Sequence, residues 1–313
     1  MSGTKYANAV GAVRAMENSL ISKSDLERLI NAKNIDEIHL IQSQKCISLQ
    51  NNALDEVWNM LNEYAPECKE LEILLYKNDF HNLKAVLKAL ISNREPSDYY
   101  ISPSNVELKA LVDSLNNRDY SELPIYMQKT AADAYELLTN SLDGQLSDSL
   151  IDKSAIQAMQ KSADDFGSDF MKKYSCLIAV CADIKTTYRC IMQKKSRQFM
   201  DTALSGSDKL DKNLLINSAS EGIEAFFAFL ETTPYSEAAT MLKESPAKFE
   251  KWCDDIIIEL AESARTMAFG AEPLAAYYIA RETEQKNLRI LSVCKEFGAD
   301  KKTITERMRK LYV

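Results

Sequence analysis

The feature that most constrains the fold of this chain is a short pattern that occurs three times at nearly equal spacing. In each copy an acidic residue is followed three positions later by a polar residue, within a helical stripe of apolar residues. The pairs are Asp79 with Asn82, Asp183 with Thr186, and Glu284 with Asn287. The acids are 104 and 101 positions apart in a chain of 313 residues. Recurrence at a fixed period indicates internal repetition, so the sequence predicts three copies of one helical unit.

The residues around the first and third acids strengthen this prediction. Residues 70–84 match residues 273–289 in their order of apolar, acidic and polar positions, and both end in Asn-Leu followed by a basic residue, Lys84 or Arg289. The middle copy keeps its acid but has Thr186 in place of asparagine, and its basic residue lies one position later. The middle copy is therefore the least similar of the three.

Composition favours helices over strands. The chain has only 8 Gly and 7 Pro, well below the usual roughly 7% and 5%, so a turn-rich β-sandwich or barrel is disfavoured. Four segments have the spacing of a capping box at a helix start: Ser24 with Glu27, Ser104 with Glu107, Ser218 with Glu221, and Thr303 with Glu306. We therefore expect an all-α fold.

Apolar periodicity and the helix breakers give the expected elements. Helices are expected over residues 5–20, 25–42, 53–64, 67–92, 104–115, 124–141, 147–173, 175–204, 218–231, 234–243, 246–267, 272–296 and 302–310. The last long helix has Glu272 and Pro273 in its first turn, where an acid suits the helix dipole and the missing N–H of proline costs nothing.

Charge and hydropathy exclude several classes of protein. The net charge of −8 and the sequence pI near 5.1 disfavour nonspecific nucleic-acid binding, which needs a basic face. No apolar run reaches the 18 or more residues of a membrane span. The N-terminus lacks the layout of a signal peptide, and the seven cysteines lack CxxC spacing, which is typical of reduced thiols in the cytosol.

The recurring acids are expected to point inward. Helical spacing puts Asp79 on one face with Asn82, Leu83 and Val86, and Glu284 on one face with Asn287. A carboxylate in an apolar stripe is costly unless it is paired or hydrogen-bonded. We therefore interpret the acids as acceptors for donors on neighbouring segments. The alternative, an ion or proton site, is weaker because such sites need several acids close together.

Signals for catalysis are nearly absent. The sequence contains no phosphate-binding loop, GxGxxG, HExxH or GxSxG motif, and its only imidazoles are His39 and His81. Three cysteines fall on one expected helix, Cys176, Cys181 and Cys190, but without the spacing of metal ligands. No catalytic residue, cofactor or metal site is predicted.

Residues 296–307 can be drawn as a helix-turn-helix with a basic second helix. Because this shape is common among helical proteins and the chain is acidic, a closing helical hairpin is the preferred interpretation over DNA binding.

The C-terminal third and the N-terminus carry a recognisable set of residues. In the C-terminal third these are Gly270, Glu272-Pro273-Leu274, Tyr277, Glu282, Glu284, Asn287-Leu288-Arg289, Gly298, Glu306, Arg307 and Tyr312-Val313, and at the N-terminus they are Tyr6-Ala7-Asn8-Ala9 and Arg14-Ala15-Met16-Glu17. With these residues and the segment around Asp79, the chain resembles the family of C subunits of V-type (A/V-type) ATPases of bacteria and archaea, whose eukaryotic counterpart is the d subunit. The resemblance is strongest in the C-terminal third.

The resemblance implies three similar helical bundles, at residues 1–103, 104–207 and 208–313, arranged with pseudo-threefold symmetry as a funnel. It also implies a peripheral subunit on the cytoplasmic face of the membrane that lies between the central shaft of the ATPase head and the membrane ring of proteolipid subunits. Such a subunit transmits torque and binds neither ATP nor the transported ion.

Three other functions compete with this one. A helical-repeat scaffold or adaptor would share the composition, although solenoid periods are usually 20–50 residues. A DNA-binding regulator would use the C-terminal hairpin, and an enzyme of unknown type lacks any supporting set of residues.

Overall fold

The computed structural model describes residues 6–44, 53–92, 94–141 and 143–313, and these are helical except for turns and one isolated β-bridge between Ser207 and Leu210. The expected all-α fold is confirmed. The chain divides into two compact units: unit 1 contains Met1–Leu71 and Thr240–Val313, and unit 2 contains Glu72–Ala239. These boundaries differ from those of the three expected bundles, whose arrangement stays a prediction.

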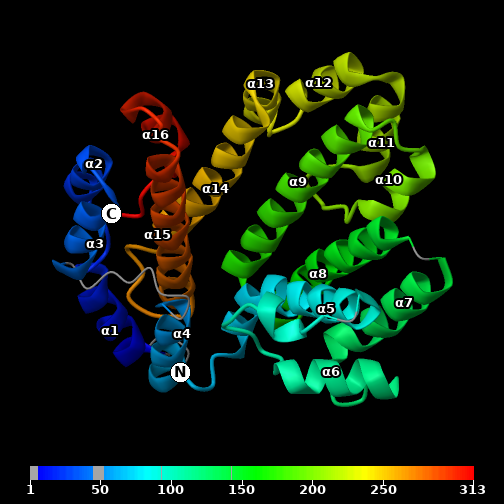
Figure 1. Ribbon diagram of the computed structural model, residues 1–313, viewed down its shortest axis with the longest axis horizontal. Coiled ribbons are helices and arrows are strands. Elements are labelled where there is room, and N and C mark those ends of the chain that lie inside the picture. The colour runs from blue at the N-terminus through cyan, green and yellow to red at the C-terminus, as the bar shows by residue number, and fades with distance from the viewer. Residues whose placement is uncertain (1–5, 45–52, 93, 142) are drawn as a thin grey trace. The chain divides into compact units, whose positions relative to one another are not determined.

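Unit 1 is built around one long helix, α15, which contacts α1, α3, α4, α14 and α16 (Figure 1). Its helices are α1 (Ala7–Glu17), α2 (Lys23–Asn31), α3 (Ile35–Gln44), α4 (Ala53–Tyr64), α14 (Pro246–Glu262), α15 (Glu272–Glu296) and α16 (Lys301–Arg307). All eight residues from Pro273 to Ala280 are buried. A helix that is buried all round is enclosed by other elements, and here α1, α4 and α14 enclose it.

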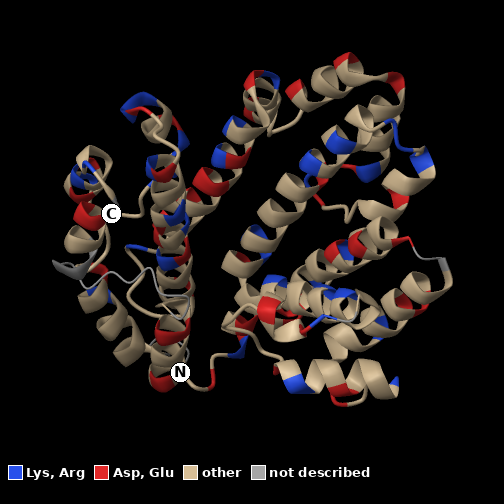
Figure 2. Ribbon diagram, in the orientation of Figure 1, with Lys and Arg blue, Asp and Glu red and all other residues tan. Residues whose placement is uncertain are grey.

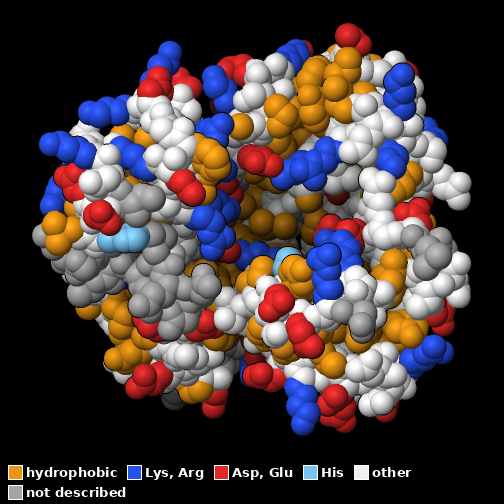
Figure 3. Space-filling view, viewed as in Figure 1, with side chains coloured by type: hydrophobic (Ala, Val, Ile, Leu, Met, Phe, Trp, Pro, Cys, Tyr) orange, Lys and Arg blue, Asp and Glu red, His pale blue; other side chains and the backbone are white. Residues whose placement is uncertain are grey.

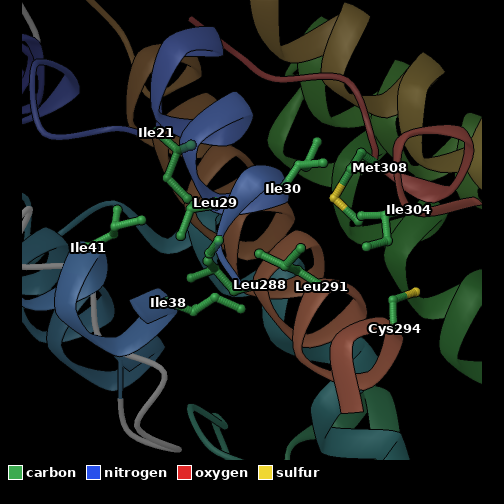
Figure 4. Close-up of a cluster of buried hydrophobic side chains, with 11 residues drawn as sticks. Ile21, Leu29, Ile30, Ile38, Ile41, Leu288, Leu291, Cys294, Ile304 and Met308 are labelled. Carbon is green, nitrogen blue, oxygen red and sulfur yellow. The ribbon is translucent and has the colours of Figure 1, made fainter. Parts of the chain in front are cut away.

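The second half of α15 closes the core of unit 1 against α2, α3 and α16. Figure 4 shows Leu288, Leu291 and Cys294 of α15 facing side chains of these three elements. The cluster consists of Ile21, Leu29, Ile30, Ala32, Ile38, Ile41, Leu288, Leu291, Cys294, Ile304 and Met308.

Unit 2 is built around α8, which contacts α5, α7, α9 and α10. Its helices are α5 (Tyr76–Ser92), the 3-10 helix η2 (Pro96–Tyr99), α6 (Leu108–Asn117), α7 (Ile125–Ser141), α8 (Gly144–Phe166), α9 (Asp169–Met192), α10 (Arg197–Ala203), α11 (Lys212–Glu221) and α12 (Ile223–Glu231). Two further elements contain the unit boundaries, the 3-10 helix η1 (Lys69–Leu75) and α13 (Ser236–Glu244).

Two expected helices coincide with the structure, residues 53–64 and 272–296, and several others are broken where the sequence suggested continuity. The expected helix 175–204 starts earlier, at Asp169, ends at Met192 and is followed by the separate α10. The expected helix 218–231 is interrupted at Gly222, whose φ of 121° is unfavourable for residues with a side chain.

The expected capping boxes are wrong in position. Helix α2 is capped by Ser22, whose side chain and that of Asp25 form a reciprocal box, so Ser24 lies inside the helix. The caps of α11 and α16 are Asp211 and Asp300, upstream of the expected Ser218 and Thr303. Ser104 caps no helix, because its hydroxyl donates to Asp79 and α6 begins only at Leu108.

Candidate functional site

Asp79 lies in the first turn of α5 and is fully buried. Its Oδ1 accepts hydrogen bonds from the Ser104 hydroxyl at 2.7 Å and the Asn105 backbone N–H at 2.8 Å. Its Oδ2 accepts from Asn105 Nδ2 and the Tyr126 hydroxyl, both at 2.8 Å. All four donors come from the chain that follows α5, so the carboxylate fastens a later segment to the start of this helix.

Asn82, one turn further along α5, binds the backbone of the segment that contains Ser104 and Asn105 through its side-chain amide. Its Oδ1 accepts from the Ile101 N–H at 2.8 Å, and its Nδ2 donates to the Ile101 carbonyl at 2.9 Å. Asn78 Nδ2 donates to the Pro103 carbonyl at 2.8 Å. Asn78, Asp79 and Asn82 therefore fix residues 101–105, which would otherwise have few backbone partners.

Burial is the main electrostatic influence at this position. It raises the pKa of Asp79, and the hydrogen bonds from Ser104, Tyr126 and Asn105 oppose that rise because they stabilise the ionised form. Burial, followed by the charge of Asp79, also raises the pKa of Tyr126. The phenol ring of Tyr126 stacks on Tyr76 with centroids 4.0 Å apart, so the donor is held in place by its ring.

Asp183 lies on α9 and makes a smaller version of this arrangement. Its Oδ1 accepts from the backbone N–H and the hydroxyl of Ser205, both at 2.9 Å, and its Oδ2 accepts from the Gly206 N–H at 2.7 Å. Burial raises the pKa of Asp183, against the effect of the two backbone N–H groups. The acid thus fastens the segment that follows α10, 22 and 23 residues downstream.

Thr186 does not repeat the role of Asn82. It is only partly buried, and its side chain makes no hydrogen bond with any residue in the described ranges of the chain. The segment next to Asp183 instead borders an open cavity of about 460 Å³ whose lining includes Gln160, Lys172 and Asp208. Acids and lysines are mixed in this lining, which also contains Cys176. Burial raises the pKa of the Cys176 thiol, which disfavours the reactive thiolate.

Glu284 on α15 has a different set of partners. Its Oε1 accepts a short hydrogen bond from the backbone N–H of Ile21, and its Oε2 pairs with Arg281 Nη1 at 2.9 Å. Arg281 also donates to the Tyr277 hydroxyl at 2.9 Å and to the Ser19 hydroxyl. Burial raises the pKa of Glu284, and the charge of Arg281 opposes the rise. This acid holds the turn between α1 and α2.

Asn287 repeats the geometry of Asn82. Its Oδ1 accepts from the Arg309 N–H at 2.7 Å, and its Nδ2 donates to the Arg309 carbonyl at 3.2 Å. In both copies an asparagine three positions after the acid binds the N–H and C=O of one residue in a segment that follows. The clamped residue lies 19 positions downstream of Asn82 and 22 downstream of Asn287.

The segment that Asn287 holds is the C-terminal tail after α16, which has further anchors on α14. Arg309 Nε pairs with Asp254 at 2.7 Å, and the backbone N–H of Lys310 donates to Asp255 at 2.7 Å. The Tyr312 hydroxyl donates to Glu17 of α1 at 3.0 Å. Burial and then the charge of Glu17 raise the pKa of Tyr312 to about 12, so this donor keeps its proton at neutral pH.

The remaining residues singled out by the sequence do not join these clusters. Glu272 is partly buried at the start of α15, with its carboxylate over Gly270, whose φ of 97° is the left-handed region that favours glycine. Pro273 is buried in the first turn. Arg289 is exposed and makes no ion pair with any residue that the structure describes.

The sequence did not predict most of the groups that donate hydrogen bonds to the buried acids. Ser104, Asn105, Tyr126, Ser205 and Gly206 lie 22 to 47 positions from the acids they serve, and no local pattern connects residues so far apart. Arg281 was not predicted either, although its position three residues before Glu284 on a helix is a spacing at which charges pair and could have identified it.

The buried carboxylates of the three clusters accept hydrogen bonds from donors within the chain. Within the described ranges no group of three or more His, Cys, Asp or Glu residues is placed to hold a metal ion. Over those same residues, no helix combines the length and apolarity that crossing a bilayer requires. His39 and His81 are both exposed; the ring of His81 contacts the Tyr99 carbonyl at 3.3 Å.

Two comparisons with known proteins agree with one another. The family model for the ATP synthase (C/AC39) subunit matches residues 47–307. The C subunit of the V-type sodium ATPase of Enterococcus hirae is 29% identical over 317 aligned residues, which cover 96% of this chain and 97% of that protein. The similarity therefore extends over both units.

Proposed function

Because the chain belongs to the ATP synthase (C/AC39) subunit family, we propose that it is a non-catalytic central-stalk subunit of a rotary V-type ATPase. In this role it couples the rotating shaft of the ATPase head to the membrane ring of proteolipid subunits. The partners are the shaft subunits on one side and the ring on the other, and the chain reaches the cytoplasmic face of the membrane through protein contacts alone.

The observation that carries the proposal is the end-to-end similarity to a protein named as the C subunit of a V-type sodium ATPase. The similarity covers nearly the full length of both chains, so it is not confined to a shared module. The sequence adds that the chain lacks a phosphate-binding loop, as suits a subunit that neither hydrolyses ATP nor carries the ion. Ion choice, proton or sodium, then belongs to the ring.

The internal geometry suits a part that bears load. Torque reaches the ring only if the coupling subunit does not shear, and close-packed interiors transmit strain because they compress little. The acid clusters join segments far apart in sequence by multiple hydrogen bonds, with four at Asp79 and three at Asp183. Hydrogen bonds to charged acceptors are the stronger kind. These bonds tie a connecting segment to a long helix at both acids, and at Asp79 they also tie α7 to α5.

The threefold organisation belongs to the same proposal. We divide the chain into bundles at residues 1–103, 104–207 and 208–313, related by a pseudo-threefold axis in a funnel. The identical two-bond clamp of Asn82 on Ile101 and Asn287 on Arg309 supports a shared origin for the first and third bundles.

Depletion and add-back test the coupling role. Membranes that carry the ATPase are stripped of this chain, and ATP hydrolysis and ion uptake are measured before and after the purified chain is restored. We expect stripped membranes to hydrolyse ATP with little ion uptake, and the chain to restore uptake. Full uptake without the chain would refute the coupling role and favour the alternative of a helical scaffold or adaptor.

A further inference from the structure

The segment that follows α16 and its cap, Arg309–Val313 (the tail), has no helix or strand of its own and returns across unit 1 toward the N-terminal helices (Figure 1). Met308, the cap of α16, lies in the core of unit 1 beside Ile304 (Figure 4). All five residues of the tail are buried or partly buried. A segment without a backbone ladder is held by contacts with other elements, so these contacts decide whether the tail stays in place.

Side chains of two helices bind the backbone of the tail. Asn287 of α15 binds both the N–H and the carbonyl of Arg309. Asp255 of α14 accepts a hydrogen bond from the Lys310 N–H at 2.7 Å. No backbone hydrogen bond of α14 or α15 takes part in these contacts, so both helices keep their own bonds when the tail leaves.

Complementary charge also holds the tail on α14. Figure 2 shows acidic residues along this helix, and on the face drawn in Figure 3 acidic and basic side chains lie next to one another over α14 and α15. Four carboxylates of α14 contact the tail, and within the described ranges two bases from outside the tail pair with them. The two cations of the tail, Arg309 and Lys310, balance the other two acids. The acids are Asp254, Asp255, Glu259 and Glu262, and the outside bases are Lys251 and Lys286.

These contacts are weaker than those that hold the neighbouring helices. The side chain of Lys310 is 38% exposed, and exposed ion pairs contribute little each and are screened by salt. In the tail only Tyr312 is fully buried, whereas α15 has 14 buried residues. Local opening starts in segments with few buried contacts, so the tail is expected to open before α15 does.

The end of the tail covers Glu284. Leu311, Tyr312 and Val313 form one wall of a cavity of about 10 Å³, and the other wall includes Ile21 and Glu284. A cavity of this size holds at most about one water molecule. Glu284 is 5% exposed. Removal of the tail therefore gives water access to the Glu284 carboxylate and to its hydrogen bond with the Ile21 N–H.

We propose that the tail is a reversible latch, which leaves its place on α14 and α15 while the rest of unit 1 stays folded. Met308 remains in the core and acts as the hinge. The open latch admits water to Glu284 and frees the turn between α1 and α2, and the closed latch shields both. The inference concerns the chain by itself and does not rest on the proposed function, so its failure leaves the coupling role untouched.

Hydrogen exchange of the full-length wild type, followed amide by amide, tests the latch without any substitution. Exchange is measured at about 0.05 M and about 0.5 M salt, between which the screening length falls about threefold. The Ile101 amide is the internal control. Asn82 holds Ile101 as Asn287 holds Arg309, but the residues on either side of Ile101 carry no charge.

We expect the Arg309 and Lys310 amides to exchange at least about tenfold faster than the Leu291 amide of α15, and severalfold faster again at the higher salt concentration. The Ile21 amide should gain with them, while Ile101 and Leu291 stay unchanged. Tail amides that exchange only as slowly as Leu291, or that do not respond to salt, overturn the latch. If the Ile21 amide does not follow the tail, the tail does not control access to Glu284.

The variant Lys310→Glu tests the charges directly. It places an acid opposite Glu259 and Glu262, so the Arg309 amide should exchange about tenfold faster at low salt and less than tenfold faster at high salt. Lys33→Glu makes the same charge change at an exposed lysine of unit 1 and should leave the Arg309 amide unchanged. Thermal melting checks that both variants are folded. Wild-type exchange in Lys310→Glu, or an equal acceleration in Lys33→Glu or along α15, contradicts an electrostatic latch.

Discussion

The most direct test of the buried carboxylates is the substitution Asp79→Ala. It removes the acceptor of four hydrogen bonds, from Ser104, from Asn105 twice and from Tyr126. Each buried donor left without an acceptor costs about 1–3 kcal/mol. The loss is reduced because the buried charge disappears too, and burial is the leading influence on the pKa of Asp79.

The structure narrows the expected loss in the free energy of unfolding of Asp79→Ala. The Ser104 hydroxyl lies 3.1 Å from the Val106 carbonyl and can donate there instead. The backbone N–H of Asn105 has no such alternative, and the Tyr126 ring is held by its stack on Tyr76. Two to three stranded donors, less the relief of an unburied charge, give a destabilisation of about 3 kcal/mol. Asp79→Asn keeps one acceptor oxygen and should cost about 1–2 kcal/mol.

Urea unfolding of the purified chain measures the loss, and hydrogen exchange locates it. We expect amide protection to fall first at residues 101–106 and in α5, the segments that Asp79 joins. Asp113→Ala removes an exposed acid of α6 and serves as the control, expected within about 0.5 kcal/mol of the wild type. If Asp79→Ala matched this control, or if protection fell equally in both units, the clamp would not contribute as argued.

The other clusters give three further predictions. Asn287→Ala should release the tail at Arg309 and cost about 1–2 kcal/mol, seen as faster exchange of the Arg309 amide; unchanged exchange would contradict the clamp. Arg281→Ala leaves Glu284 buried without its cation and should cost about 3–5 kcal/mol, whereas the double variant with Glu284→Gln should lose less than the sum of the two single losses; strict additivity would show no coupling. The raised pKa of Asp183 means that the folded chain binds a proton more tightly than the unfolded chain, so the stability of the wild type relative to Asp183→Asn should fall as pH rises from about 4 through the raised value. Relative stability that increases with pH over that window would reverse the sign and refute it.

The sequence predicts the helices better than it predicts what joins them. Helical periodicity and the few breakers identify the all-α fold, and Gly270 and Pro273 mark the start of α15. Three of the predicted capping boxes fail because a residue further upstream caps the helix, which is Ser22 for α2, Asp211 for α11 and Asp300 for α16. The fourth fails because the Ser104 hydroxyl donates to Asp79 and α6 begins only at Leu108.

The same limit applies to the candidate site. Periodicity predicts that Asp79, Asp183 and Glu284 face inward, and the structure buries all three. The partners cannot be read locally, because closing a loop of 20 or more residues depends on how the intervening helices pack. The repeat also suggests that the three copies are more alike than they are. In the second copy, Thr186 cannot supply the paired donor and acceptor of an asparagine amide.

The differences among the three clusters bear on how such a subunit would carry load. The first and third copies pair an acid with an asparagine clamp, and the third adds Arg281 and a tail fastened to α14 and α1. The second relies on three hydrogen bonds to Ser205 and Gly206. Local opening occurs first where the fewest bonds and contacts must break, so the segment at Ser205 should exchange its amides faster than Ile101 or Arg309. If these three segments open at equal rates, the number of fasteners does not set their stability, and stiffness comes from helix packing alone.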